Sequence, residues 1–201
     1  MKLTQANHEA RARNVTASEV GALLGHHPYA TPQSIYDRLT GDTTPRDASE
    51  AMEVGSAMEG AILRYAMDRH GFRARQNSRT YEHKRVRLAA TPDAFSPKLP
   101  WDIVAVPAIV EVKMSARIDQ WRHDLPIQYE WQVRAQMACT NRDHAVVFAL
   151  VGMSLRTYAV YRDAAKEGAM LEAVERFWTD HVLTGLRPEP IDTKPVEISF
   201  P

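Results

Sequence analysis

The stretch 91–113, TPDAFSPKLPWDIVAVPAIVEVK, constrains the fold more than any other part of the chain. Its last six residues form an apolar run that contains two charges, two positions apart. Because side chains alternate between the two faces of a strand, Glu111 and Lys113 project from one side and the neighbouring valines from the other. We expect this strand to pair with the segment that ends in TPDAF, which would bring Asp93 beside Glu111.

Two carboxylates and a lysine on one strand face are typical of a metal-dependent nuclease site. Burying a lysine beside acidic groups is costly unless the charges are paired or hydrated. Mg²⁺ prefers oxygen ligands, keeps several waters, and in phosphodiester hydrolysis activates the attacking water. The D…E-x-K pattern alone also occurs by chance, with Asp93 as a turn residue and Lys113 as a solvated lysine on an edge strand.

The composition indicates one domain over residues 1–201, with 187–201 as an extended arm rich in proline. The 25 basic residues balance the 25 acidic ones, so any contact with nucleic acid must come from a local basic surface. Cys139 is the single cysteine, which excludes an internal disulfide and a four-cysteine metal site. With no signal peptide and no apolar run of about 20 residues, we expect a soluble cytoplasmic protein with no membrane contact.

Three helices are expected in the amino-terminal third. The first follows a capping box formed by Thr16 and Glu19 and ends at Gly25. The second is expected over 32–40 and the third over 49–70, each ended by a glycine.

The third helix carries a stripe at three- and four-residue spacing that predicts its buried face. Its members are Met52, Gly55, Glu59, Ile62, Leu63 and Ala66. Glu59 is therefore expected to point inward, with a pairing to Arg64 or Arg69 as the alternative.

Strands dominate the centre of the chain. Alternation in 81–95 predicts a strand that pairs with AIVEVK across the loop 96–107. Further elements follow as a helix over 128–140, strands over 144–151 and 155–162, and a helix over 163–184. This order predicts an α/β (α+β) fold with a mixed central sheet flanked by helices. No glycine-rich phosphate loop of the GxxxxGK or GxGxxG type is present.

Several of these segments agree, in order, with one family. They are R-x4-TASEV, G-x3-E, TPDAF, EVK and Y-x2-Q-x3-Q, at 11–20, 55–59, 91–95, 111–113 and 129–136. The chain resembles the lambda-exonuclease (YqaJ-like) viral recombination nucleases, a branch of the PD-(D/E)XK superfamily. It departs from the family in its proline-rich loop 96–107 and in lacking a tryptophan before the arginine of the first motif.

The resemblance implies a site in which Asp93 and Glu111 ligate Mg²⁺ together with the backbone carbonyl of Val112. Glu59 faces the same site, and Lys113 positions or activates the attacking water. Two ions are expected, with Mn²⁺ as a substitute. The implied catalytic set is Glu59, Asp93, Glu111, Lys113 and Gln132.

A second implied site binds the 5′-phosphate and the DNA. An anion would be suited by the hydroxyls of Thr16 and Ser18, by free amides at a helix start and by a nearby arginine. The arginine is either Arg11 or Arg13, and an ordinary helix cap is the plainer interpretation of Thr16. Gln136 is implied to contact the water or the DNA backbone.

The activity that the resemblance implies is an Mg²⁺-dependent 5′→3′ exonuclease that leaves 3′ single-stranded tails on duplex DNA for phage-type recombination. The implied partners are DNA ends, two further copies in a homotrimer, and a single-strand annealing protein in the bacterial cytoplasm. Two alternatives stay open: an endonuclease of the same superfamily, and a non-catalytic module that binds DNA ends.

Overall fold

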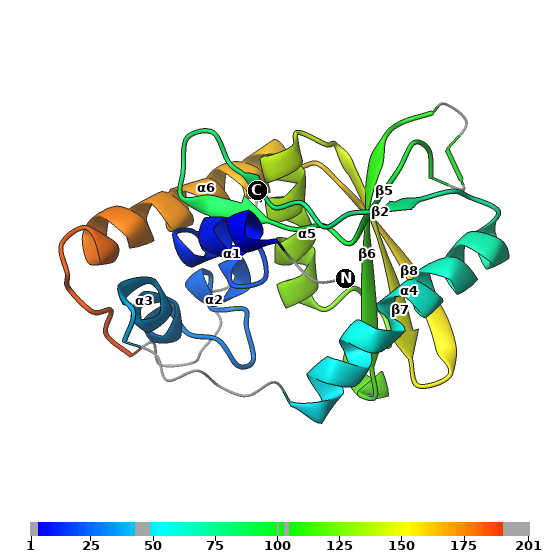
Figure 1. Ribbon diagram of the computed structural model, residues 1–201, viewed down its shortest axis with the longest axis horizontal. Helices are drawn as coiled ribbons and strands as arrows, with labels where there is room; N and C mark the ends of the chain where they lie inside the picture. Colours follow the sequence, from blue (N-terminus) through cyan, green and yellow to red (C-terminus); the bar gives the residue numbers. More distant parts are fainter. Residues whose placement is uncertain (1–3, 43–48, 100, 103–104, 191–201) are drawn as a thin grey trace.

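The computed structural model describes residues 4–42, 49–99, 101–102 and 105–190, and it contains two sheets (Figure 1). The larger has the strand order β2-β5-β6-β7-β8, with β6 parallel to β7 and the other neighbours antiparallel. Its strands are β2 (Arg75–Gln76), β5 (Ala94–Ser96), β6 (Ala108–Ser115), β7 (His144–Val151) and β8 (Ser154–Tyr161). The smaller has the order β1-β4-β3, formed by β1 (Val15–Thr16), β4 (Leu88–Ala90) and β3 (Tyr81–Glu82). These mixed sheets with flanking helices confirm the predicted fold class.

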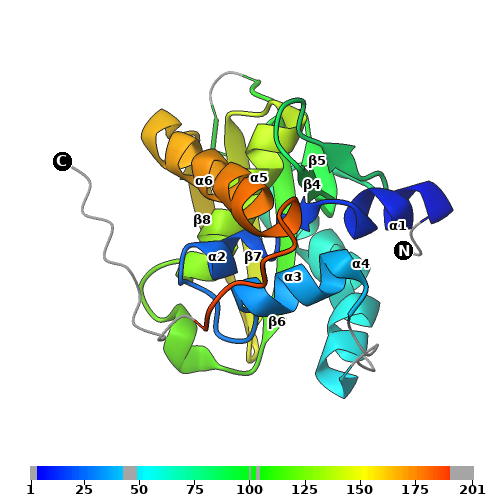
Figure 2. The same ribbon diagram turned by 90° about the vertical axis from the view of Figure 1, so that its left-hand side faces the viewer.

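Helices cover both faces of the larger sheet. One helix, α4 (Glu50–His70), packs on β6 and β7, and α5 (Ile127–Thr140) lies on the other face. The remaining helices gather beyond α5, around the smaller sheet (Figures 1 and 2). They are α1 (Gln5–Ala12), α2 (Val20–Leu23), α3 (Pro32–Thr40) and α6 (Ala164–Phe177), which continues as the π-helix η2 (Trp178–Val182). A short 3-10 helix, η1 (Ile118–Trp121), lies apart from this group. None of the described helices is long and apolar enough to cross a membrane.

The predicted ranges of α3 and α4 are confirmed, and both helices are capped at each end. Thr31 caps α3 through a capping box with Ser34, and Ser49 caps α4. Gly41 and Gly71 end these helices with φ of 85° and 66°, a left-handed conformation that glycine adopts at little cost. The predicted helix over 128–140 and the two strands after it are confirmed to within one residue, and the closing helix is present as α6, which continues as η2 to Val182.

The helix predicted after the TASEV motif is shorter than expected. Thr16 belongs to strand β1, where it pairs with Ala89, and α2 begins only at Val20. The Glu19 side chain accepts hydrogen bonds from the backbone N–H of Thr16 at 2.8 Å and from its hydroxyl at 2.8 Å. Only the glutamate half of the predicted capping box is therefore formed, and it tightens a strand-to-helix turn.

The prediction of a single strand over 81–95 is wrong. The segment contains three short strands, because the chain turns at 84–87 and again at 91–93. Of the three, β5 alone pairs with β6, in the antiparallel register Ala94↔Val110. The expected pairing with AIVEVK is thus confirmed at the one place where it matters for the site.

The predicted buried stripe of α4 holds only in its second half. Ile62, Leu63 and Ala66 are buried against the valines of β6 and Phe148 of β7. Met52 is 65% exposed, contrary to the prediction, because the first half of α4 extends past the sheet (Figure 1). Glu59 lies at the boundary between the two halves and is half-buried.

Candidate active site

The ends of β5 and β6 bring Asp93 and Glu111 together. Continuing the β5–β6 register by one residue places Asp93 opposite Glu111, on the same face of the sheet. The carboxylate of Asp93 accepts a hydrogen bond from the backbone N–H of Val112 at 2.7 Å. The loop after β5 therefore folds back as the predicted chemistry requires, although its residues 100, 103 and 104 lie outside the described part of the chain.

Four donated hydrogen bonds fix the two carboxylates of this site, and three of them go to Glu111. Lys113 and Gln132 donate to its Oε1 at 2.6 and 2.5 Å, and Gln136 donates to its Oε2 at 2.7 Å. Glu111 is only 2% exposed, so its charge depends on these donors. The α5 face predicted to carry both glutamines thus lies directly over the carboxylate.

Lys113 lies beyond the end of the β5–β6 ladder, but its side chain is only 21% exposed and donates to Glu111, which excludes the solvated-lysine alternative. Burial acts to lower the pKa of Lys113, but Glu111 and Asp93 outweigh this effect and raise it. The ammonium also lies 5.2 Å from the ring centroid of Tyr129, and that ring stacks on Trp121 at 5.1 Å. Lys113 is therefore a protonated donor held in one position between a carboxylate and an aromatic face.

Glu59 approaches this cluster from α4. Burial raises its pKa and Glu111 adds to the effect, while Lys113 opposes it. Burial and the charge of Glu111 likewise raise the pKa of Asp93 well above its usual range, with a further contribution from Glu59. The three carboxylates thus repel one another electrostatically, although no hydrogen bond joins Glu59 to the other two in the described part of the chain.

The residues present fit a hard cation such as Mg²⁺. Asp93 and Glu111 offer carboxylate oxygens, and the mutual repulsion that raises the pKa of Asp93 is what a bound cation relieves. The Oε1 atom of Gln136 is buried beside Glu111 with no hydrogen-bond partner, so it is an acceptor suited to a metal-bound water. Among the described residues no three His, Cys, Asp or Glu side chains converge on one point, so a cation held by Asp93 and Glu111 would take its remaining ligands from backbone or water oxygens.

A second polar hollow, of about 290 Å³, lies beside the TASEV turn. It is lined by His8, Arg11, Ala12, Thr16, Ser18, Glu19 and Arg38. Burial lowers the pKa of Arg11, although Glu19 opposes this, and Arg11 has no carboxylate within 4 Å in the described chain. An anion in this hollow would give Arg11 a charged partner, whereas the Ser18 hydroxyl already bonds that of Thr16 at 3.1 Å.

The structure separates the two arginines that the sequence left as alternatives. Arg13 points away from the hollow and pairs with Glu82 at 2.6 Å, while Arg11 lines it. Arg38 was not predicted: its guanidinium makes two 2.7 Å contacts with Glu19 and donates to the backbone carbonyls of Arg11 and Asn14. Nothing local in α3 indicates this role, because all of its partners are distant in sequence.

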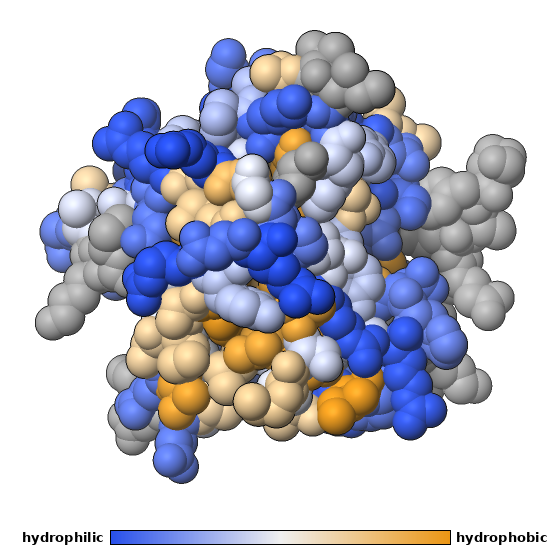
Figure 3. Space-filling view, turned by 90° about the vertical axis from the view of Figure 1, so that its right-hand side faces the viewer, coloured by the Kyte–Doolittle hydropathy of each residue, from blue (hydrophilic) through white to orange (hydrophobic). Residues whose placement is uncertain are grey.

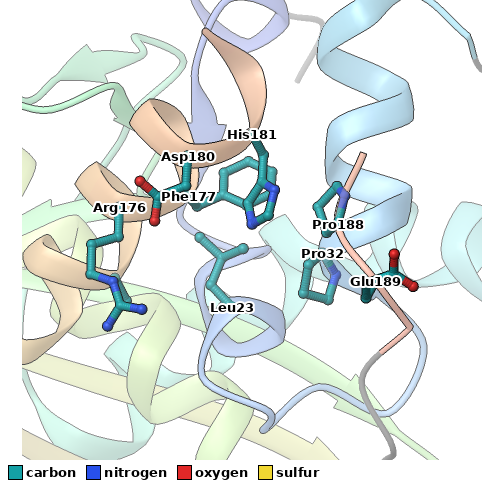
Figure 4. Close-up of a pocket in the computed structure, with 9 residues that line it drawn as sticks. Leu23, Pro32, Arg176, Phe177, Asp180, His181, Pro188 and Glu189 are labelled. Carbon is teal, nitrogen blue, oxygen red and sulfur yellow. The ribbon is translucent and has the colours of Figure 1, made fainter. Parts of the chain in front are cut away.

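A hollow of about 440 Å³ lies elsewhere, between the end of α6 and the start of α3 (Figure 4). Leu23, Pro32, Phe177 and Pro188 form its apolar wall. It contains none of the carboxylates of the site, so it has no part in the chemistry described above.

Comparison with known proteins identifies a family and structures of similar fold. Residues 7–143 match the model of the YqaJ-like viral recombinase domain. An alkaline exonuclease from Laribacter hongkongensis, LHK-Exo, has a similar structure: its complex with dAMP gives a TM-score of 0.71 at 20% identity, covering 90% of this chain and 94% of that one. A phage-related exonuclease from Haemophilus somnus 129PT gives a TM-score of 0.60 at 12% identity, covering 86% and 96%. No curated protein sequence matches the chain significantly.

Proposed function

Because the chain belongs to the YqaJ-like viral recombinase family, we propose that it is an Mg²⁺-dependent exonuclease that digests one strand of duplex DNA from a 5′-phosphorylated end. The observation that supports this most directly is that Asp93 lies opposite Glu111 across β5 and β6, with Lys113 held against Glu111. The named exonucleases of similar fold are consistent with the proposal.

Each residue has a role that follows from its contacts. Asp93 and Glu111, with Glu59 nearby, would hold one or two Mg²⁺ ions, which when bound lower the pKa of water and stabilise the leaving oxygen. Gln132 and Gln136 keep the Glu111 carboxylate oriented. Lys113 donates from its ammonium to the water or to the scissile phosphate, because its raised pKa keeps it protonated.

End recognition is assigned to the hollow of Arg11, Thr16 and Ser18. The Arg11 guanidinium, which has no carboxylate within 4 Å in the described chain, suits a terminal phosphate, which would fix the 5′→3′ polarity and leave a 3′ single-stranded tail. We further propose that the chain works as a homotrimer around the duplex, in the cytoplasm of a phage-bearing bacterium, and delivers the tail to a single-strand annealing protein. Mn²⁺ is expected to substitute for Mg²⁺.

The experiment compares linear duplex bearing 5′-phosphate with the same duplex bearing 5′-hydroxyl, in Mg²⁺ and in chelator. We expect nucleotide release from the 5′-phosphate duplex in Mg²⁺ alone, and its loss in Glu111→Ala. Arg11→Gln should reduce the preference for 5′-phosphate, whereas the matched change Arg13→Gln should not. Cleavage of closed circular DNA at the same rate would support an endonuclease instead, and end-binding without hydrolysis would support a loading module.

A further inference from the structure

Three arginines surround an exposed edge of the five-stranded sheet without any acidic partner. In the described part of the chain Arg75, Arg79 and Arg142 have no carboxylate within 4 Å, unlike the arginines that form the ion pairs of this protein. The Arg79 guanidinium lies 5.2 Å from the ring centroid of Tyr81, and that of Arg142 lies 5.2 Å from the ring of Phe95. Arg75 is the cross-strand partner of Phe95.

The two rings form one support for these charges. Tyr81 and Phe95 meet edge to face with their centroids 5.7 Å apart. Stacking on a ring orients a guanidinium while leaving its N–H groups free to bind an acceptor. Arg75 and Arg79 are exposed and Arg142 is half-buried, so all three can reach a ligand.

This arginine cluster lies next to the carboxylates of the active site. Phe95 follows Asp93 by two residues, and its partner Ile109 precedes Glu111 by two, so these side chains share one face of the sheet. Two residues along a strand span about 7 Å. Seen from the side of β2 and the end of α4, a hydrophilic band crosses the molecule (Figure 3). A ligand extending from the site along this edge therefore meets unpaired positive charge.

We propose that Arg75, Arg79 and Arg142 bind the phosphates of the DNA strand that continues from the cleavage site. A polyanion suits this edge, because three neighbouring guanidinium groups there have no carboxylate within 4 Å in the described chain. Planar guanidinium groups bind phosphate oxygens through two parallel hydrogen bonds. The identity of the bound strand rests on the proposed function. The binding of a polyanion at this cluster does not depend on it.

The test measures binding of fluorescently labelled linear duplex with a 3′ single-stranded tail by anisotropy, in chelator so that no cleavage occurs, across a salt series. Each phosphate contact contributes about 0.7 to 0.9 to the slope of log K against log salt. The triple variant Arg75→Gln, Arg79→Gln, Arg142→Gln is expected to lower that slope by about 2 to 3. The matched control is Arg176→Gln, an exposed arginine on α6 far from the cluster, which should leave the slope unchanged.

Two further variants separate binding from folding. The triple lysine variant keeps the charges and should retain most of the slope, whereas a packing role of the arginines would not be rescued by lysine. The single change Arg79→Glu should weaken binding on its own even if the triple glutamine variant fails to fold. A slope unchanged in Arg79→Glu and in the triple variant would overturn the inference. If the wild type binds DNA through the cluster but hydrolyses nothing in Mg²⁺, the proposed function is wrong and the role of the cluster in binding is supported. If the wild type hydrolyses DNA but the cluster variants bind it as the wild type does, the proposed function is supported and the role of the cluster is wrong.

Discussion

Asp93→Asn should stabilise the metal-free protein while it abolishes metal-dependent hydrolysis. Burial and the Glu111 charge raise the pKa of Asp93, so at neutral pH the folded state carries a repulsion that the unfolded chain lacks. Asparagine removes the charge but keeps an oxygen that can accept the Val112 N–H. Function and stability are therefore expected to oppose each other at this residue.

The size of the effect follows from the strand geometry. Side chains opposite each other on neighbouring antiparallel strands have their Cβ atoms about 5 Å apart. Two charges about 5 Å apart repel by about 3 kcal/mol at an effective dielectric constant of about 20. Attraction from Lys113 offsets part of this, so we expect a net gain of about 1 to 2 kcal/mol in the free energy of unfolding. For a chain of this size each kcal/mol raises the Tm by about 2 to 4 °C.

Thermal unfolding in chelator from pH 4 to 8 measures this gain. A carboxyl whose folded pKa is raised contributes stability that is complete below its unfolded pKa, about 3.9, and is lost as the pH rises through the folded value. The wild type should therefore lose stability relative to Asp93→Asn as the pH rises, while the exposed control Asp68→Asn follows the wild type. The reasoning is refuted if Asp93→Asn is no more stable than the wild type at pH 7.5, or if the difference is the same at pH 4.

Three more outcomes are expected. Tyr129→Leu should lower kcat with little change in KM, because it removes the ring that holds Lys113, and Tyr129→Phe should restore the rate; equal losses in both variants would exclude a positioning role. Gly168→Ala should raise stability by about 0.5 to 1 kcal/mol, since a Cβ there meets open space within α6, whereas Gly71→Ala should lower it because φ is 66°; chemical denaturation compares the two. Burial raises the pKa of the Cys139 thiol to about 12, so thiol reagents should label native protein at pH 8 far more slowly than denatured protein, and equal rates would contradict the burial.

The elements that the sequence predicts well are those with strong local signals. The caps at Thr31 and Ser49 and the glycines after α3 and α4 mark helix ends through contacts within a few residues. The alternation around Glu111 determines which side chains share a face of β6. Both kinds of signal depend only on neighbours in the chain, so no knowledge of the fold is needed to detect them.

The missed features depend on distant partners. The eight-residue helix α1 carries no apolar stripe and was not predicted, because its stability comes from contacts such as that of the Asn7 amide with the backbone carbonyl of Ser78 at 71 residues' separation. Strands β1 to β4 contain only two or three residues each, too few for a period to appear. Arg38 and the arginine cluster likewise acquire their roles only when separate segments meet.

The hydrogen bond between the Asp93 carboxylate and the Val112 amide has a practical consequence. The β5–β6 ladder ends at the pair Ala94↔Val110, so a carboxylate replaces the missing strand as the acceptor for that amide. Any event that draws the Asp93 oxygen away frees one backbone proton on β6, just beyond the end of the β5–β6 ladder. Hydrogen exchange at this single amide, followed by NMR on isotopically labelled protein, would therefore record the state of the carboxylate without a substrate or a substitution.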